Sequence, residues 1–118
     1  MTTTPVPAEG DALVIDVVEE EDRICAAVRG DIDIDGADIF DAAVERALLR
    51  NLPIVIDLSD ATFLGSRGIA AIVRARRLLG DGLGPITVVV TRDVQRRALE
   101  VTGVDRLVHI EPTSQGAT

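Results

Sequence analysis

Two short apolar runs restrict the possible folds of this chain more than any other feature of its sequence. Residues 53–58 read PIVIDL and residues 85–91 read PITVVVT. Runs of this length, rich in β-branched residues, are typical of strands buried on both faces of a parallel sheet. Between them, apolar residues recur at helical spacing at Ile69, Ile72 and Leu79. This pattern predicts a strand, a helix and a second strand in succession.

The rest of the chain extends this unit into an α/β domain. Two apolar runs flank the acidic turn 19–22 and indicate an antiparallel hairpin. The resulting order β-β-α-β-α-β-α-β predicts a mixed, mostly parallel sheet that the hairpin opens, with at least three helices. Sites in such sheets lie beyond the carboxyl ends of the parallel strands, here in the loops after Asp57 and Thr91. The expected strands cover residues 12–18, 23–29, 53–58, 85–91 and 106–110, and the expected helices cover residues 37–50, 66–79 and 94–101.

The length of 118 residues fits one domain, which we expect over residues 11–111. Residues 1–10 and 112–118 are polar and rich in Thr, Pro and Gly, so we expect a flexible leader and a flexible tail. No apolar run reaches the roughly 18 residues that span a bilayer, and no signal peptide is recognisable. We therefore expect a cytoplasmic protein without membrane insertion, and a monomer because no heptad or apolar repeat is present.

The charge composition excludes several classes of function. The chain has 20 acidic residues and 12 basic residues, all of them arginine, for a net charge of −8. Such a chain is poorly suited to neutralise nucleic-acid phosphates. Without lysine it cannot form a Schiff base or a Walker A phosphate site, and it lacks the lysine of phosphotransfer receiver domains. The lone Cys25 and lone His109 offer no disulfide and no metal site, so we expect no enzyme activity and no cofactor.

The most specific pattern lies in residues 55–79, which read VIDLSDATFLGSRGIAAIVRARRLL. An apolar strand ends in Asp-Leu, a loop carries a Phe-Leu pair, and a Gly-Ser-Arg-Gly turn precedes an amphipathic helix. Upstream, a Gly-Asp-Ile-Asp motif follows the second expected strand. These motifs resemble the signature of the STAS family, whose bacterial members are anti-sigma-factor antagonists, over about residues 12–110. The matching residues are Gly30, Asp31, Ile32, Asp33, Asp57, Leu58, Phe63, Leu64, Gly65, Ser66, Arg67 and Gly68.

The resemblance implies a STAS-like fold and a phosphorylation switch. Ser66 takes the place of the serine that, in the family, is phosphorylated by a kinase that is also the anti-sigma factor. The unphosphorylated antagonist binds that kinase and frees the sigma factor, phosphorylation ends the binding, and a serine phosphatase resets the switch. The implied partner-binding residues are Asp31, Asp33, Asp60, Thr62, Phe63, Leu64, Gly65, Arg67 and Gly68.

Two residues depart from the family motif and leave alternatives open. Gly65 replaces the Asp that precedes the serine, and Arg67 replaces a small hydroxyl residue. They favour an alternative in which the domain is a scaffold or accessory module of a stress-signalling or transporter complex, without a phosphorylation switch. A small nucleotide-binding or hydrolytic α/β protein is a third hypothesis, against which the missing lysine and phosphate loop weigh.

Each candidate residue also has a purely structural interpretation. Ser66 is suitably placed to N-cap the second helix. Asp57 could accept hydrogen bonds from amides of the loop that follows it, and Asp31 and Asp33 are typical turn residues. Cys25 fits a small buried apolar position.

Overall fold

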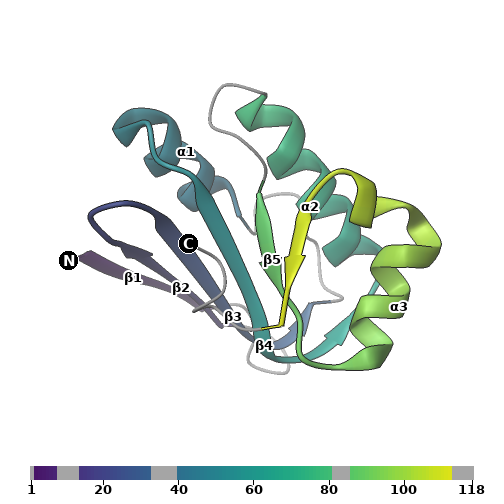
Figure 1. Ribbon diagram of the computed structural model, residues 1–118. Helices are drawn as coiled ribbons and strands as arrows, with labels where there is room; N and C mark the ends of the chain where they lie inside the picture. Colours follow the sequence, from purple (N-terminus) through teal and green to yellow (C-terminus); the bar gives the residue numbers. More distant parts are fainter. Residues whose placement is uncertain (1, 8–13, 33–39, 81–85, 113–118) are drawn as a thin grey trace.

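In the computed structural model, residues 2–7, 14–32, 40–80 and 86–112 are described, with the backbone alone at positions 2–7, 14, 30–32, 62, 63 and 67. They form a six-stranded sheet in the order β1-β2-β3-β4-β5-β6 (Figure 1). The elements are β1 (Thr2–Pro7), β2 (Val14–Glu19), β3 (Ile24–Ile32), α1 (Asp41–Arg50), β4 (Ile54–Leu64), α2 (Ser66–Leu79), β5 (Thr87–Val89), α3 (Asp93–Thr102), the 3-10 helix η1 (Val104–Arg106) and β6 (His109–Glu111).

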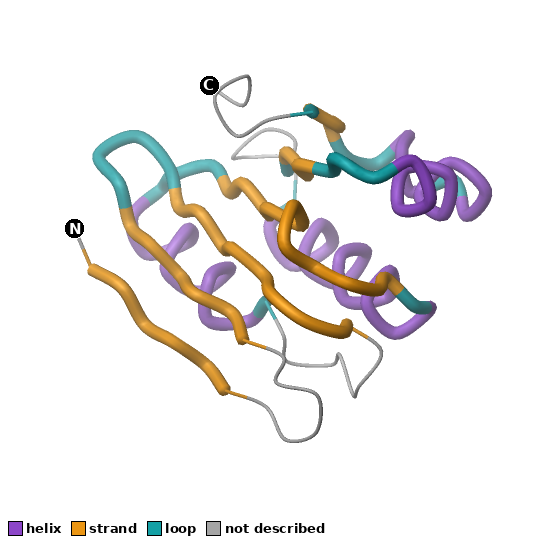
Figure 2. Tube along the Cα trace, turned by 90° about the horizontal axis from the view of Figure 1, so that it is seen from below, coloured by secondary structure: helices purple, strands orange, loops and turns teal. Residues whose placement is uncertain are grey.

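The strand pairing confirms the predicted mixed sheet. β1, β2 and β3 pair antiparallel, whereas β3, β4, β5 and β6 pair parallel. Figure 2 shows α1 and α2 next to each other on one side of this sheet. The element order of the sequence prediction is therefore correct from β2 onward, with η1 added before a last strand that begins at His109 instead of residue 106.

Strand β4 forms the centre of the core. Its successive residues Ile54, Val55 and Ile56 are all buried, and Leu58 is fully buried as well. Because successive side chains of a strand point to opposite faces, burial of consecutive residues means that both faces of β4 are covered. The continuous apolar run 53–58 predicted this arrangement correctly.

Helix ends are set by left-handed backbone positions. α1 ends at Asn51, which has a φ of 55° and donates its N–H to the carbonyl of Ala47. α2 ends at Gly80, where φ is 66°, and the N–H of Gly80 bonds to the carbonyl of Arg76. Both residue types tolerate positive φ, glycine because it has no Cβ and asparagine through its short polar side chain. These ends return the chain to the amino ends of the parallel strands.

The structure corrects the prediction of a flexible leader. Thr2–Pro7 form β1, in which Thr3 lies opposite Val18 and Val6 lies opposite Ile15. Three consecutive threonines and a valine favour extended backbone. The two prolines are tolerated because β1 is an edge strand and needs only half of its backbone donors. The predicted tail lies almost entirely outside the described residues, which end at Pro112.

β4 is also longer than its apolar run predicted. The expected strand ends at residue 58, yet β4 continues to Leu64 and replaces most of the predicted loop. Along this extension the register with β3 shifts between Ala27 and Arg29 and again between Gly30 and Asp31. Such bulges admit polar residues that break the alternation, so Ser59 and Asp60 continue the strand where the sequence pattern predicted a loop.

We expect Ile56→Ala to lower the free energy of unfolding by about 2–5 kcal/mol, because it leaves a cavity at a fully buried position of the central strand. Leu49→Ala is the matched control, since Leu49 is 76% exposed, and it should change stability by less than about 0.5 kcal/mol. The chain has no Trp or Tyr, so urea unfolding is followed by far-UV circular dichroism. Equal losses in both variants would contradict the central position of β4.

Candidate functional site

The candidate site lies where β4 ends and α2 begins. One residue, Gly65, joins Leu64 of the strand to Ser66 of the helix, with φ −90° and ψ −176°. This extended geometry keeps Gly65 outside the helix while its carbonyl accepts the N–H of Ile69 at 3.0 Å. The chain therefore changes directly from strand to helix at the carboxyl end of a parallel strand, where α/β sheets usually carry their sites.

Ser66 is exposed and is the first residue of α2. The local sequence predicted that Ser66 is the N-cap of this helix, but Gly65 occupies that position. A glycine has no side chain with which to cap the helix. The first turn of α2 contains no acidic residue. Its unpaired backbone N–H groups and the positive end of the helix dipole would therefore favour an added anion.

Neighbouring residues anchor this turn in the core. Gly65 and Gly68 are buried, and Leu64 is only 8% exposed and packs in the core cluster. Buried residues on both sides of an exposed serine fix the position of Ser66 relative to the sheet.

The structure brings the upstream motif next to this turn. In the parallel pairing of β3 with β4, Asp31 lies opposite Phe63 and Ile32 lies opposite Leu64. Asp60 is exposed on the same stretch of β4. Thr62 belongs to β4 and Arg67 to α2, whereas Asp33 lies outside the described residues.

Asp57 has a local structural role. Its Oδ1 accepts the backbone N–H of Ser59 at 2.9 Å and also the Ser59 hydroxyl. The prediction that Asp57 bonds to backbone in the segment that follows it is therefore confirmed.

Asp57 lies near Cys25 on the face of the sheet to which Val55 also points. Cys25 pairs with Val55, so Asp57 is its diagonal neighbour on β4. Burial raises the pKa of the Cys25 thiol, and the negative charge of Asp57 raises that pKa further, while Arg23 lowers it. A thiol with a raised pKa is a poor nucleophile at neutral pH, so Cys25 is not a candidate reactive group.

Sequence reasoning missed Gln95, a buried polar residue that contacts the strand leading to this site. Gln95 lies on α3, is 2% exposed, and donates from Nε2 to the carbonyl of Ala61 at 2.9 Å. The one available signal was its helical spacing from Leu99, which is also buried. That spacing places Gln95 on the apolar side of α3.

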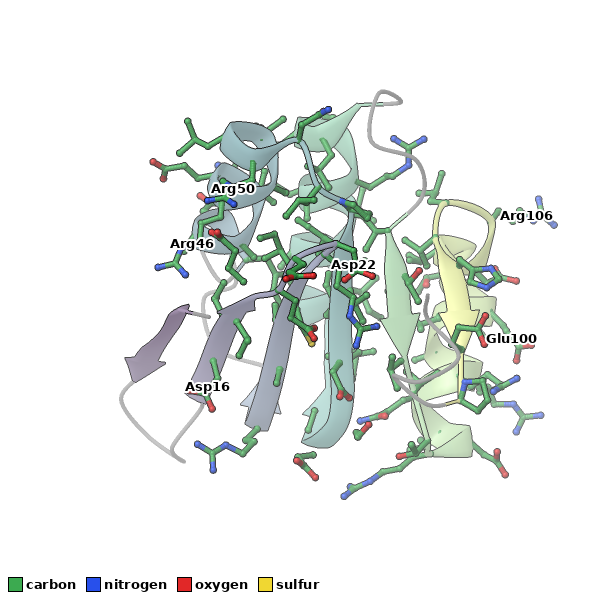
Figure 3. All side chains as sticks on the ribbon, turned by 60° about the vertical axis from the view of Figure 1, so that its left-hand side comes forward. Asp16, Asp22, Arg46, Arg50, Glu100 and Arg106 are labelled. Carbon is green, nitrogen blue, oxygen red and sulfur yellow. The ribbon has the colours of Figure 1, made fainter. Side chains whose placement is uncertain are left out.

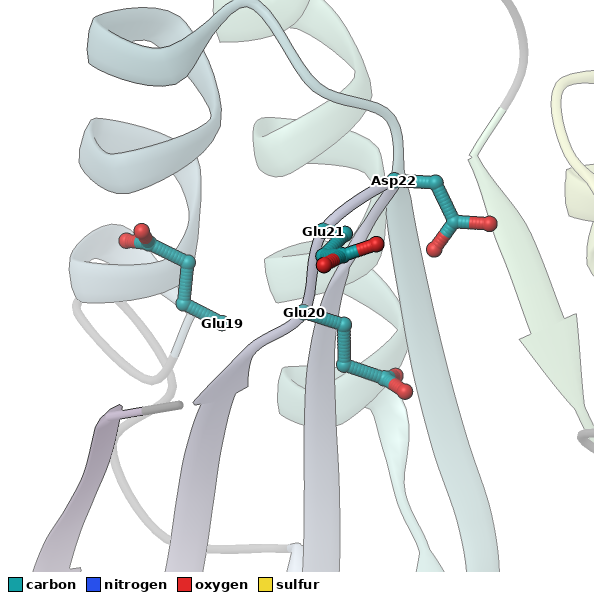
Figure 4. A pocket seen from close by; sticks show the side chains of 4 residues that line it. All are labelled: Glu19, Glu20, Glu21 and Asp22. Carbon is teal, nitrogen blue, oxygen red and sulfur yellow. The ribbon is translucent and has the colours of Figure 1, made fainter.

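The acidic turn lies at the other end of the molecule. Glu19, Glu20, Glu21 and Asp22 line a shallow depression (Figure 4) between the end of β2 and the start of β3. Because β3 and β4 are parallel, the start of β3 lies beside the start of β4, away from Ser66. Arg23 pairs with Glu20 and Arg50 pairs with Glu19, each at 2.9 Å, so arginines offset part of this charge.

The labelled charged side chains outside this turn come from separate elements of the fold. Asp16 lies on the sheet, Arg46 and Arg50 on α1, and Glu100 and Arg106 near the far edge (Figure 3). Among the described residues, no three His, Cys, Asp or Glu side chains lie close enough to hold a metal ion. Within the same part of the chain, every helix is too short or too polar to cross a membrane.

Comparison with known proteins assigns this architecture to a family. A family model described as the STAS domain matches residues 14–117. The chain belongs to the STAS-domain family. A comparison with curated protein sequences found no significant match.

This STAS domain is also similar to proteins of known structure. An anti-sigma factor antagonist from Mycobacterium paratuberculosis is 29% identical, with a TM-score of 0.78 and 95% of each chain covered. The anti-sigma factor antagonist SpoIIAA in its unphosphorylated form is 13% identical, with a TM-score of 0.65 over 87% of this chain and 93% of the other. The phosphorylated form of SpoIIAA from Bacillus is 12% identical, with a TM-score of 0.63 over 87% and 96%. The two SpoIIAA structures share the fold.

We expect the pH profile of Cys25 alkylation to report how close the charges of Asp57 and Arg23 lie to this thiol. Its midpoint should lie above the pKa of about 8.5 of a free cysteine, because burial disfavours the thiolate. Asp57→Asn should move the midpoint down by removing a negative charge, and Arg23→Gln should move it up by removing a positive one. Iodoacetamide labelling with mass detection gives both profiles, and shifts of the same sign in the two variants would contradict the described placement.

Proposed function

We propose that this STAS domain is an anti-sigma-factor antagonist that binds an anti-sigma factor with serine kinase activity. Phosphorylation of Ser66 by that kinase ends the binding, and a serine phosphatase restores it, so the protein regulates sigma-factor-dependent transcription as a binding protein and not as an enzyme. The observation that carries this proposal is the exposure of Ser66 between buried anchors at the start of α2.

The surface proposed for the partner surrounds that serine. Asp60 and Ser66 are its exposed described side chains. Strand pairing adds Asp31 opposite Phe63, and the motif adds Thr62, Arg67 and Asp33. Leu64, Gly65 and Gly68 support this surface from beneath, since all three are buried.

Electrostatics explains how phosphate would act here. A phosphoserine adds a charge of about −1.5 to −2 together with strong acceptor oxygens. At the start of α2 those oxygens would meet unpaired backbone N–H groups, so the modified helix would remain folded. A partner packed against Ser66 would, however, have to desolvate the new charge, which is costly without a paired cation. Binding is therefore lost without unfolding the domain.

Gly65 and Arg67 support a second candidate, a STAS scaffold or accessory module that phosphorylation does not regulate. Gly65 removes the acidic residue of the family motif, and Arg67 places a cation beside the serine. A cation at that position could pair with a phosphate and weaken its effect on binding. The two candidates differ in one measurable property, the sensitivity of the complex to charge at Ser66.

We expect Ser66→Asp to raise the Kd for the partner kinase by at least about tenfold, or about 1.4 kcal/mol, because the carboxylate would be buried at the interface. Asn51→Asp is the matched control, since it adds the same charge at an exposed residue just before β4. The kinase is isolated from the cells of origin with the unmodified chain, and Kd is then measured by isothermal titration calorimetry.

The scaffold candidate predicts a different pattern. There, Ser66→Asp and Asn51→Asp bind the isolated partner as tightly as the unmodified chain. That result would overturn the switch, and circular dichroism of both variants establishes that their folds are intact.

A further inference from the structure

Gln95 is the one polar or charged residue that is buried in the described part of the chain. Its Nε2 donates to the carbonyl of Ala61, a contact between residues 34 positions apart in sequence. Its Oε1 is also buried and has no hydrogen-bond partner in the structure. A buried oxygen without a partner is unfavourable, so this side chain needs an explanation beyond filling space.

Stability alone does not explain a glutamine at this position. A methionine of similar length would fill the same volume and would bury no unpaired oxygen. What a methionine cannot do is donate a hydrogen bond to a chosen backbone carbonyl. The glutamine therefore fixes the position of the Ala61 carbonyl through a directional hydrogen bond, which an apolar contact does not supply.

The carbonyl that Gln95 binds lies in the irregular part of β4. Ala61 pairs with Gly30 and lies between the two register shifts of β3 and β4, three residues before the strand end at Leu64. Irregular pairing specifies the position of a strand less firmly than a regular ladder does. A hydrogen bond from α3 at Ala61 supplies an additional fixed point, five residues before Ser66.

We propose that Gln95 is a positioning residue for Ser66. By fixing the end of β4 against α3, its side-chain amide holds the segment from Ala61 to Ser66 in the one conformation that a partner kinase would recognise. This inference rests on the proposed function for the role of Ser66, but the contact through which it acts is independent of phosphorylation.

The first test measures backbone order in the full-length chain by hydrogen exchange. In Gln95→Met we expect amides of residues 61–69 to exchange about fivefold to tenfold faster than in the unmodified protein, because one hydrogen bond that closes the segment is lost. Amides of β2 should be unaffected. Ile15→Val, a core change in β2, is the control, and it should not accelerate exchange selectively in residues 61–69. Unchanged exchange in that segment, or equal acceleration across all amides, would overturn the proposal.

A conservative variant separates positioning from simple packing. In Gln95→Glu, burial raises the pKa of the new carboxyl group, and in its protonated form this group can donate to the Ala61 carbonyl. In its ionised form it has no proton to donate and can only repel that oxygen. Exchange of residues 61–69 is measured at about pH 5.5 and about pH 8 and taken relative to the unmodified protein at each pH. It should be slower at the lower pH, where more of the carboxyl group is protonated, than at the higher. Equal relative exchange at both pH values would contradict the hydrogen-bond role.

A phosphorylation assay with the isolated kinase tests whether the Gln95–Ala61 hydrogen bond affects the modification of Ser66. Gln95→Met should raise the KM for phosphorylation of Ser66 while the folded state persists, because fewer molecules present the segment correctly. An unchanged KM would overturn the positioning role. Absence of phosphate on Ser66 in the unmodified protein would instead overturn the proposed function, while the exchange data would still decide whether Gln95 holds this segment.

Discussion

The burial of β4 on both faces is the constraint on which the rest of the molecule depends. Ile54 and Ile56 face one side, Val55 faces the other, and all three are buried. Because β4 is covered on both faces and paired on both edges, its position relative to the neighbouring strands is fixed. The parallel strands on either side, and the helices that connect them, follow from that position because parallel pairing requires crossovers.

The position of Ser66 is a consequence of how this strand ends. β4 begins as a regular ladder and becomes irregular beyond Asp57, where polar residues enter and the register with β3 shifts. Beneath the surface, Leu64 and Gly65 anchor the turn, and Gln95 holds Ala61 from α3. The result is an exposed serine at the start of α2 with buried residues on either side of it.

Much of the fold was predictable from sequence, because it depends on local patterns. Continuous apolar runs identified β4 and β5, and a glycine and an asparagine with positive φ end the first two helices. β1 was missed because a segment rich in threonine and proline usually indicates a loop. Here that segment pairs with β2 as an edge strand, where prolines are tolerated.

The finer features of the site depend on tertiary contacts, which no local pattern reports. Ser66 resembles an N-cap in sequence, yet the extended backbone of Gly65 moves the helix start by one residue. The extension of β4 to Leu64 depends on bulges against β3. Gln95 has the sequence neighbours of an ordinary surface helix, and only the packing of α3 on β4 makes it a buried donor.

Phosphosite mapping of the protein from its own cells tests whether Ser66 is a phosphorylation switch. Intact-mass analysis of the unmodified chain is compared with that of Ser66→Ala and of Ser59→Ala, a second serine whose hydroxyl instead bonds to Asp57. We expect one phosphate, located on Ser66, that disappears in Ser66→Ala and persists in Ser59→Ala. Absence of phosphate on Ser66 under every growth condition would contradict the switch and favour an unregulated STAS scaffold.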